Sequence, residues 1–136
     1  MSVDFTIQEK IELIVGFYDS YGYIAENIDD FPIVKRFIEA GYAELNENNV
    51  YVKNKQGSEL LHDTIEAISM DLINNMKKSG WTMPLNKMLT WFIEYYCLSD
   101  KDIGELLMNY IHKNLQTYGY NIYPSQNRGK FILEKV

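Results

Sequence analysis

The hydrophobic positions of the chain recur with helical spacing and are separated by short polar turns. Ile7, Ile11, Ile14 and Tyr18 follow one another at intervals of three and four residues, which is the period of one helix face. We therefore expect a first helix at about residues 6–19. The next unit, YIAENI, is a short segment of apolar and polar residues and predicts one or two further helical turns.

The following segment has the residues of a helix start, a helix end and a hairpin. Asp29 and Asp30 predict an N-cap, and Pro32 suits the first turn of a helix running from about Phe31 to Ala40. Gly41 occupies a position typical of a left-handed helix end. YAEL and VYV, on either side of NENN, predict a short hairpin.

A longer apolar stripe predicts the longest helix of the chain, from Ser58 to about residue 79. Lys77 and Lys78 fall in its last turn, where positive charge complements the helix dipole. The stripe consists of Leu61, Ile65, Ile68, Leu72, Ile73 and Met76.

Two more helices and a pair of strands are expected after this long helix. Pro84 opens the first helix, and its predicted buried positions are Leu85, Met88, Leu89, Phe92, Ile93 and Tyr96. SDKD at 99–102 resembles a capping box and predicts a helix to about Tyr118. The tail YNIYPSQNRGKFILEKV then predicts two short strands.

Together these elements predict a mainly α chain with small β-hairpins, an α+β class with about five helices and one or two short hairpins. A length of 136 residues with 46% hydrophobic content suits one core, so we expect residues 1–136 to form a single domain. A membrane span is not expected, because no apolar run approaches about 20 residues. The N-terminus lacks a secretory pattern and Cys97 is the single cysteine, so a cytoplasmic protein is expected.

Two segments of the chain resemble each other. FIEAGYAELNENNVYV and LQTYGYNIYPSQNRGKFIL both run from a helix end through Gly-Tyr into a strand, an Asn-containing turn and another strand. A true repeat would imply two tandem modules. Alternatively, a helix that enters a hairpin commonly uses Gly and Tyr at this point, and the likeness is then local.

The negative charge is concentrated in the first part of the chain. Residues 1–56 carry five basic and ten acidic groups, whereas residues 57–136 carry eight and nine. The first part therefore has a net charge of −5 and the second of −1. This asymmetry bears on the choice between a nucleic-acid partner and a protein partner.

The segments IAENI, IVKRFIEAGYAEL and NNVYVKNKQGSELL resemble winged-helix domains in their order of elements. The resemblance covers about residues 6–79 and leaves residues 80–136 as a helical extension with a C-terminal hairpin. It implies that the helix at Val34–Gly41 would enter the major groove of DNA and that the hairpin would be the wing. The candidate DNA contacts are then Lys35, Arg36, Lys53 and Lys55.

Two features of this segment depart from the DNA-binding pattern. Its candidate recognition helix looks about one turn short and begins with Asp29 and Asp30. Residues 26–55 carry four basic and six acidic groups, and such a surface would repel phosphates. We therefore interpret Lys35 and Arg36 as ordinary surface charges, with Lys35 placed to pair with Glu39 along the helix.

Catalytic and metal-binding patterns are sparse. Glu59 and His62 could lie on one helix face as two metal ligands, but a metal site would need further ligands. His112 has no acidic neighbour, and Cys97 falls on an apolar helix face where a buried thiol is expected. We find no phosphate loop and no nucleophile elbow, and predict neither an enzyme nor a need for a metal or cofactor.

Tyrosine is abundant, with eleven in the chain. Tyrosine is enriched at protein interfaces because it combines an apolar ring with a polar tip. Tyr18, Tyr96 and Tyr110 fall on the helix stripes and are expected in the core. The tyrosines in turns and strands could be exposed: Tyr21, Tyr23, Tyr42, Tyr51, Tyr118, Tyr120 and Tyr123.

These observations favour an acidic, non-catalytic module that binds a basic protein, with an immunity protein or antitoxin that masks a toxin as its sharpest form. The expected contact residues are Asp29, Asp30, Glu44, Glu47, Tyr23, Tyr42 and Tyr51. The alternative is a winged-helix transcriptional regulator that dimerises through the helix from Ser58. A second possible dimer contact is the aromatic run from Trp91 to Tyr96.

Overall fold

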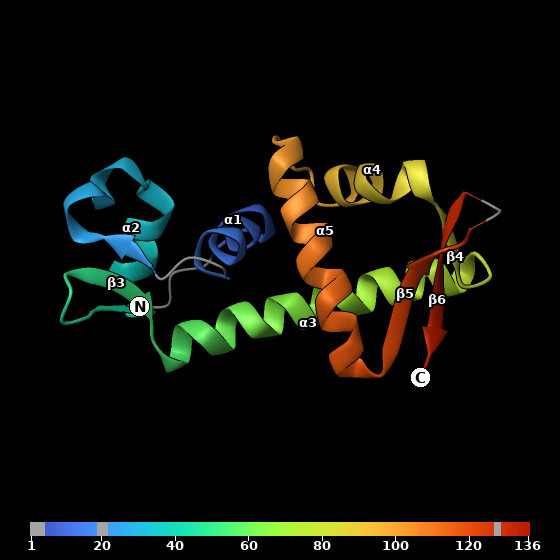
Figure 1. The fold of residues 1–136 in the computed structure, drawn as a ribbon. Coiled ribbons are helices and arrows are strands. Elements are labelled where there is room, and N and C mark those ends of the chain that lie inside the picture. Colours follow the sequence, from blue (N-terminus) through green and yellow to red (C-terminus); the bar gives the residue numbers. More distant parts are fainter. Residues whose placement is uncertain (1–4, 19–21, 127–128) are drawn as a thin grey trace. The chain divides into compact units, whose positions relative to one another are not determined.

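The computed structural model describes residues 5–18, 22–126 and 129–136 (Figure 1). Its contacts cluster into two compact units, Met1–Thr64 and Ile65–Val136, here called the N-terminal and C-terminal units. The expected mixture of helices and small antiparallel sheets is confirmed. That the whole chain acts as one domain stays a prediction. In the described part of the chain, every helix is too short or too polar to cross a bilayer.

The N-terminal unit contains a three-stranded antiparallel sheet with strand order β1-β3-β2. Its elements are α1 (Ile7–Tyr18), β1 (Tyr23–Ile24), the 3₁₀ helix η1 (Ala25–Asp30), α2 (Pro32–Glu39), β2 (Ala43–Leu45), β3 (Val50–Lys53) and the start of α3 (Lys55–Lys78). The predicted hairpin is confirmed as β2 and β3. The short strand β1 was not predicted, because it has only two residues and takes its partners, Tyr51 and Val50, from far along the chain.

The predicted N-cap of α2 is wrong. Asp29 and Asp30 lie within η1, and the residue before α2 is Phe31, whose side chain forms no capping hydrogen bond. The backbone N–H of Phe31 donates to the Ile28 carbonyl at 3.0 Å, so the 3₁₀ turn leads directly into Pro32.

Aromatic rings form the centre of the N-terminal unit. Phe37 of α2 is fully buried, and its ring centre lies 6.0 Å from that of Phe5 and 5.3 Å from that of Phe17. Tyr42 stacks on Phe37 with centres 5.2 Å apart. The contact between Phe17 and Phe37 joins α1 to α2, and Phe5 and Tyr42 complete the cluster from the adjoining segments.

The long helix α3 begins three residues before the predicted Ser58. The Oδ1 atom of Asn54 accepts a hydrogen bond from the Gly57 N–H at 2.9 Å, and its Nδ2 atom donates to the Gly41 carbonyl at 2.7 Å. Asn54 is therefore the N-cap and also fixes the end of the preceding helix. The predicted apolar stripe of α3 is confirmed, because its six residues are buried.

The C-terminal unit contains a second three-stranded antiparallel sheet, with strand order β4-β6-β5. Its elements after α3 are β4 (Thr82–Pro84), α4 (Leu85–Tyr95), α5 (Lys101–Leu115), η2 (Gln116–Tyr118), β5 (Tyr120–Pro124) and β6 (Lys130–Lys135). The two predicted tail strands are confirmed as β5 and β6. The strand β4 was missed, since three residues before a helix start give no alternating pattern.

Packing within the C-terminal unit agrees in part with the predicted apolar positions of α4. Met88, Phe92 and Tyr96 are buried, and Leu89 and Ile93 are half-buried. Leu85 is exposed, contrary to expectation, because it opens α4 directly after β4. Helix α5 is capped by Asp100, whose Oδ1 atom accepts from the Asp102 N–H at 2.8 Å.

Both units have the same order of elements. In each, a helix is followed by a short strand, further helical segments and two strands, and the last strand lies between the other two. The helical segments are η1 and α2 in the N-terminal unit, and α4, α5 and η2 in the C-terminal unit. Gly41 and Gly119, at the end of the helical part, both have a left-handed backbone and precede a tyrosine. The likeness seen in sequence thus extends to the arrangement of strands, while a true repeat remains a hypothesis.

Candidate functional site

Most of the sequence-predicted contact residues of the N-terminal unit are carboxylates on its surface. Asp29 and Asp30 lie in η1, Glu44 lies in β2 and Glu47 lies in the turn before β3, and all four side chains are exposed. Asp29 accepts a hydrogen bond from Lys35 Nζ at 3.0 Å, so its charge is partly neutralised. The other three carboxylates give this surface its negative character.

The predicted contact tyrosines are half-buried rather than fully exposed. The Tyr23 ring lies 5.0 Å from the rings of both Phe17 and Phe31, and burial, with a smaller effect of Glu12, raises the pKa of its hydroxyl. Tyr23 and Tyr51 are cross-strand partners of β1 and β3. These tyrosines therefore help to hold the unit together and offer only part of their surface to a partner.

The structure also reveals exposed apolar side chains that the sequence did not single out. Ile24 at the end of β1, Phe31 before α2 and Leu45 at the end of β2 are all exposed. Leu45 is the cross-strand partner of Tyr51, which in turn pairs with Tyr23, so Leu45, Tyr51 and Tyr23 form a row across the sheet. Ile24, Phe31 and Leu45 lie at the ends of their elements or just before one, and their exposure therefore leaves no periodic signal in the sequence.

The two basic residues of α2 are engaged within the N-terminal unit. Lys35 donates a hydrogen bond to Asp29, and this hydrogen bond is the main reason why the pKa of the Lys35 ammonium is raised. The expected pairing of Lys35 with Glu39 is wrong, because Glu39 influences the Lys35 pKa only through a weaker charge effect. Arg36 donates a hydrogen bond to the Glu9 carboxylate of α1. The remaining candidate DNA contacts are Lys53, half-buried in β3, and Lys55, exposed at the start of α3.

Glu9 links this ion pair to the start of α1. Its Oε1 atom accepts from the Thr6 N–H at 3.0 Å, and its own N–H donates to the Thr6 hydroxyl at 3.1 Å, which forms a capping box. The backbone hydrogen bond from Thr6 is the largest influence on the Glu9 pKa, and together with Arg36 it holds that pKa below its usual value.

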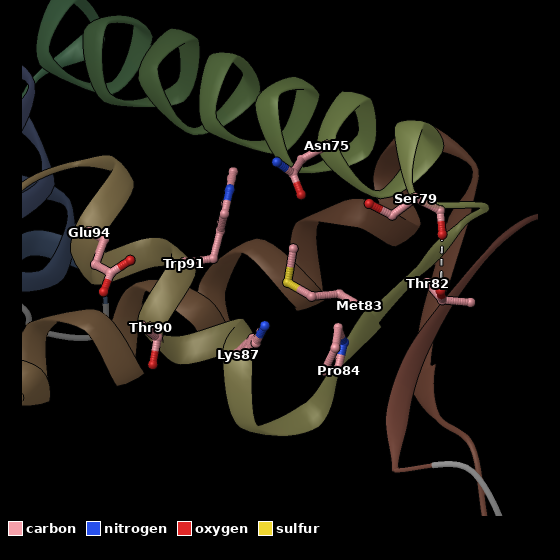
Figure 2. A pocket seen from close by; sticks show the side chains of 9 residues that line it. All are labelled: Asn75, Ser79, Thr82, Met83, Pro84, Lys87, Thr90, Trp91 and Glu94. Atoms are coloured by element: carbon pink, nitrogen blue, oxygen red, sulfur yellow. Dashed lines mark hydrogen bonds between the residues drawn. The ribbon is translucent and has the colours of Figure 1, made fainter.

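The C-terminal unit contains a pocket of about 520 Å³ between α3, β4 and α4 (Figure 2). Figure 2 shows the Trp91 indole rising from α4 toward α3, where Asn75 projects into the same space. The Thr82 hydroxyl donates to the Ser79 carbonyl at 3.1 Å at one end. The lining residues are Asn75, Ser79, Thr82, Met83, Pro84, Lys87, Thr90, Trp91 and Glu94.

This pocket offers hydrogen-bonding groups around an aromatic ring. Its volume lies within the usual range of small-molecule sites. Trp91 Nε1 is buried and has no hydrogen-bond partner among the described residues. The lining supplies hydroxyl, amide, ammonium and carboxylate groups. Sequence reasoning could not find it, because its residues come from three elements.

The remaining titratable candidates are dispersed. Glu59 and His62 are exposed on α3, and the described residues contain no cluster of three or more His, Cys, Asp or Glu side chains placed to bind a metal. Cys97 is exposed, so the expected buried thiol is wrong; it follows the end of α4, where its backbone is left-handed. Burial lowers the pKa of His112 to about 4, and its ring lies 5.2 Å from Phe131.

Comparisons with protein-family models, with curated proteins and with solved structures found no match. The chemistry of the described surfaces is therefore the basis for any assignment of function.

Proposed function

We propose that this protein is an acidic, non-catalytic binding module whose N-terminal unit binds a basic protein. The observation that supports the proposal is that the basic side chains around α2 are paired while nearby carboxylates are exposed. Both basic side chains of this helix are engaged in ion pairs within the unit, whereas the carboxylates of Asp30, Glu44 and Glu47 are exposed. Residues 1–64 carry five basic and twelve acidic groups, a net charge of −7.

The exposed apolar residues of the same unit support a protein partner. Specific interfaces usually combine a polar, charged rim with a few apolar or aromatic side chains that become fully buried. Ile24, Phe31 and Leu45 supply such side chains. The half-buried Tyr51 lies between Leu45 and Tyr23 in the sheet. A surface with carboxylates but no exposed apolar side chains would attract any cation and would not be specific for one protein.

The sharpest form of this proposal is an immunity protein or antitoxin that acts in the cytoplasm. A toxin that acts on nucleic acid has a basic surface, and an acidic inhibitor can cover it after fast, electrostatically steered association. The charge of the N-terminal unit supplies the steering, and its apolar residues supply contacts that slow dissociation.

A winged-helix DNA-binding regulator is the second candidate, and it rests on the resemblance seen in the sequence of residues 6–79. The N-terminal unit has a helix, a strand, two helical segments and a hairpin, an order that is not specific to such regulators. The candidate contacts would be Lys35, Arg36, Lys53 and Lys55. Their local charge argues against this function, because residues 26–55 hold four basic and six acidic groups.

The decisive experiment measures association with the product of the neighbouring gene. A variant with Asp30→Lys, Glu44→Lys and Glu47→Lys should associate more slowly than the unmodified protein, and the difference should shrink at high salt. Asp29 is kept, because it pairs with Lys35.

A charge-matched control is available in the C-terminal unit. Glu66→Lys, Asp102→Lys and Glu105→Lys change three exposed carboxylates and the net charge by the same amount. Equal slowing in both triple variants would reduce the effect to net charge and remove the proposed surface. Specific duplex DNA binding at physiological salt that is lost in the Lys35→Ala, Arg36→Gln variant would overturn the proposal in favour of the regulator.

A further inference from the structure

The C-terminal unit carries an aromatic and basic patch of different chemistry from the acidic surface. We define the Trp81 patch as Trp81, Tyr120, Lys77 and Lys135. The rings of Trp81 and Tyr120 are nearly parallel, at 20°, with centres 6.5 Å apart. Lys77 Nζ lies 5.9 Å from the centre of the Trp81 ring. Lys135 is the cross-strand partner of Tyr120, so both side chains leave the same face of the sheet.

Trp81 has an unfavourable backbone for a bulky residue. Its φ angle is 68°, directly after Gly80 at 72°, so two consecutive residues are left-handed where α3 ends. Only Gly80 is suited to this conformation. Strain of this kind persists when the surrounding structure holds it, and it is more common at binding sites than elsewhere.

Hydrogen bonds fix the Trp81 backbone in place. Its N–H donates to the Met76 carbonyl of α3 at 2.7 Å, and its carbonyl accepts from the Leu133 N–H of β6 at 2.9 Å. The main chain of Trp81 is therefore held between the end of α3 and the sheet. Trp81 still keeps 37% of its surface exposed, whereas the core residue Phe92 keeps none. Part of the indole is therefore accessible at the surface, beside Tyr120 and Lys77.

The charge around this ring is positive. Lys77 and Lys78 end α3, and Lys135 lies beside Tyr120. The nearest acidic residue along β6, Glu134, points to the opposite face because side chains alternate along a strand, and it accepts from the Tyr123 hydroxyl at 3.3 Å. Residues 65–136 carry eight basic and seven acidic groups, so this unit lacks the negative field of the N-terminal unit.

We propose that the Trp81 patch binds a nucleotide, with the base stacked on the Trp81 ring and a phosphate beside the ammonium groups of Lys77 and Lys135. A nucleotide combines the flat π-face that an exposed indole stacks with and the negative charge that lysines attract. A quaternary ammonium ligand would be repelled by the same lysines. A free nucleotide and a single strand share this chemistry, whereas a duplex keeps its base faces stacked inside.

The two tryptophans of the chain make a direct test possible. The Trp91→Phe variant leaves Trp81 as the only indole, so its fluorescence reports on the patch alone. We would titrate this variant at low salt with adenosine monophosphate, with single-stranded oligothymidylate, with a blunt duplex and with polyglutamate. Saturable quenching by the mononucleotide or the single strand is expected, with little response to the duplex or to polyglutamate.

The source of the nucleotide follows from the first two titrations. Binding of the oligonucleotide that is much tighter than that of the mononucleotide would identify a single strand, and similar affinities would identify a free nucleotide. Quenching by polyglutamate as strong as by either nucleotide ligand would show charge attraction alone and overturn the proposal. Absence of quenching by both nucleotide ligands would also overturn it.

Substitutions then separate binding from folding. Trp81→Gly removes the ring and relieves the left-handed strain, so it should fold, as checked by circular dichroism, and bind a fluorescently labelled oligonucleotide or mononucleotide roughly tenfold more weakly or worse. Lys77→Ala with Lys135→Ala should weaken binding and reduce its salt dependence. Lys101→Ala with Lys113→Ala removes two exposed lysines of α5 and should leave binding unchanged. Unchanged affinity of the Trp81→Gly variant would refute the site.

Discussion

Arg36 of α2 donates a hydrogen bond to the Glu9 carboxylate of α1, and its guanidinium also lies 5.1 Å from the centre of the Phe5 ring. The residue that a DNA-binding interpretation would direct toward phosphate instead joins two helices of the N-terminal unit. Glu9 in turn caps α1 through Thr6. The Arg36–Glu9 ion pair thus joins α2 to the capped start of α1, and it also neutralises a positive charge at the surface.

The first prediction concerns this pair. Arg36→Ala should lower the free energy of unfolding by about 1 kcal/mol, because it removes a partly shielded ion pair and a cation–π contact. Lys35→Ala is the matched control. Lys35 and Asp29 are largely exposed, so the loss of their ion pair should leave stability unchanged. Urea denaturation of both variants measures the difference. Equal stability of the two variants would show that the Arg36 contact contributes nothing to folding.

The second prediction gives this ion pair a pH dependence. The folded-state pKa of Glu9 is lowered, so its charge stabilises the fold above its unfolded pKa, and this contribution disappears as the pH falls through the folded value. Glu9→Gln keeps a group able to accept from Thr6 but removes the charge. The variant should therefore be less stable than the unmodified protein at pH 7, with the difference vanishing in acid. Urea titrations from pH 7 into the acid range measure the stability difference between the two proteins. A difference that stayed constant with pH would contradict the prediction.

Two glycines should resist replacement by alanine, although alanine normally stabilises a helix. A Cβ atom at Gly57, in the first turn of α3, would lie 2.1 Å from the Tyr42 carbonyl oxygen. At Gly104 in α5 it would lie 2.8 Å from Ile93 Cγ1, where α4 and α5 approach closely. Gly104→Ala should cost roughly 1–3 kcal/mol of stability, since side chains can shift, and Gly57→Ala should cost more, since backbone must move. Thermal unfolding of the two variants tests this order, and a stabilised variant would contradict it.

The fourth prediction is acid destabilisation through His112. Burial lowers its folded-state pKa to about 4, so the unfolded chain binds a proton more readily at acidic pH. The stability that depends on neutral His112 is fully present above the unfolded pKa of about 6.5 and is lost as the pH falls toward 4. The free energy of unfolding should fall by an amount on the order of 3 kcal/mol over this range. His112→Met should remove this part of the pH dependence.

The control for His112 is the other histidine of the chain, His62, which is exposed on α3. His62→Gln should keep the acid destabilisation of the unmodified protein. Free energies of unfolding from urea titrations at pH 7 and pH 4 are the relevant measurement. Parallel pH profiles for His112→Met and the unmodified protein would show that His112 is not the group responsible.

The sequence was most informative where structure is local. Helical stripes such as Ile65, Ile68 and Leu72 identified α3 correctly, and the Gly41 and NENN signals located the β2–β3 hairpin. Strands β1 and β4 were missed because they have two and three residues and are stabilised by partners far along the chain. Backbone pairing at a distance leaves no period in so short a segment.

The candidate surfaces were predictable only in part, for a related reason. A count of charges identified the acidic N-terminal half, but it could not show that Arg36 is paired with Glu9, 27 residues away. Nor could it show the backbone angle of Trp81, which depends on how α3 ends and on its bond to Leu133. Exposure of Cys97 likewise follows from the end of α4 at Tyr95, which leaves Cys97 outside the helix whose apolar face was expected to bury it.

The order of strands has a consequence for how the protein forms during synthesis. In each sheet the central strand is made last, so β1 and β2 emerge from the ribosome before β3, and β4 and β5 before β6. The flanking strands have no ladder partner until then. The N-terminal sheet can close once Lys53 has emerged, while β4 and β5 must wait, with their edges open, for residues 130–135. Translation that stops before β6 would therefore release a nascent chain with one finished sheet and two unpaired strands, a natural substrate for chaperones and proteases.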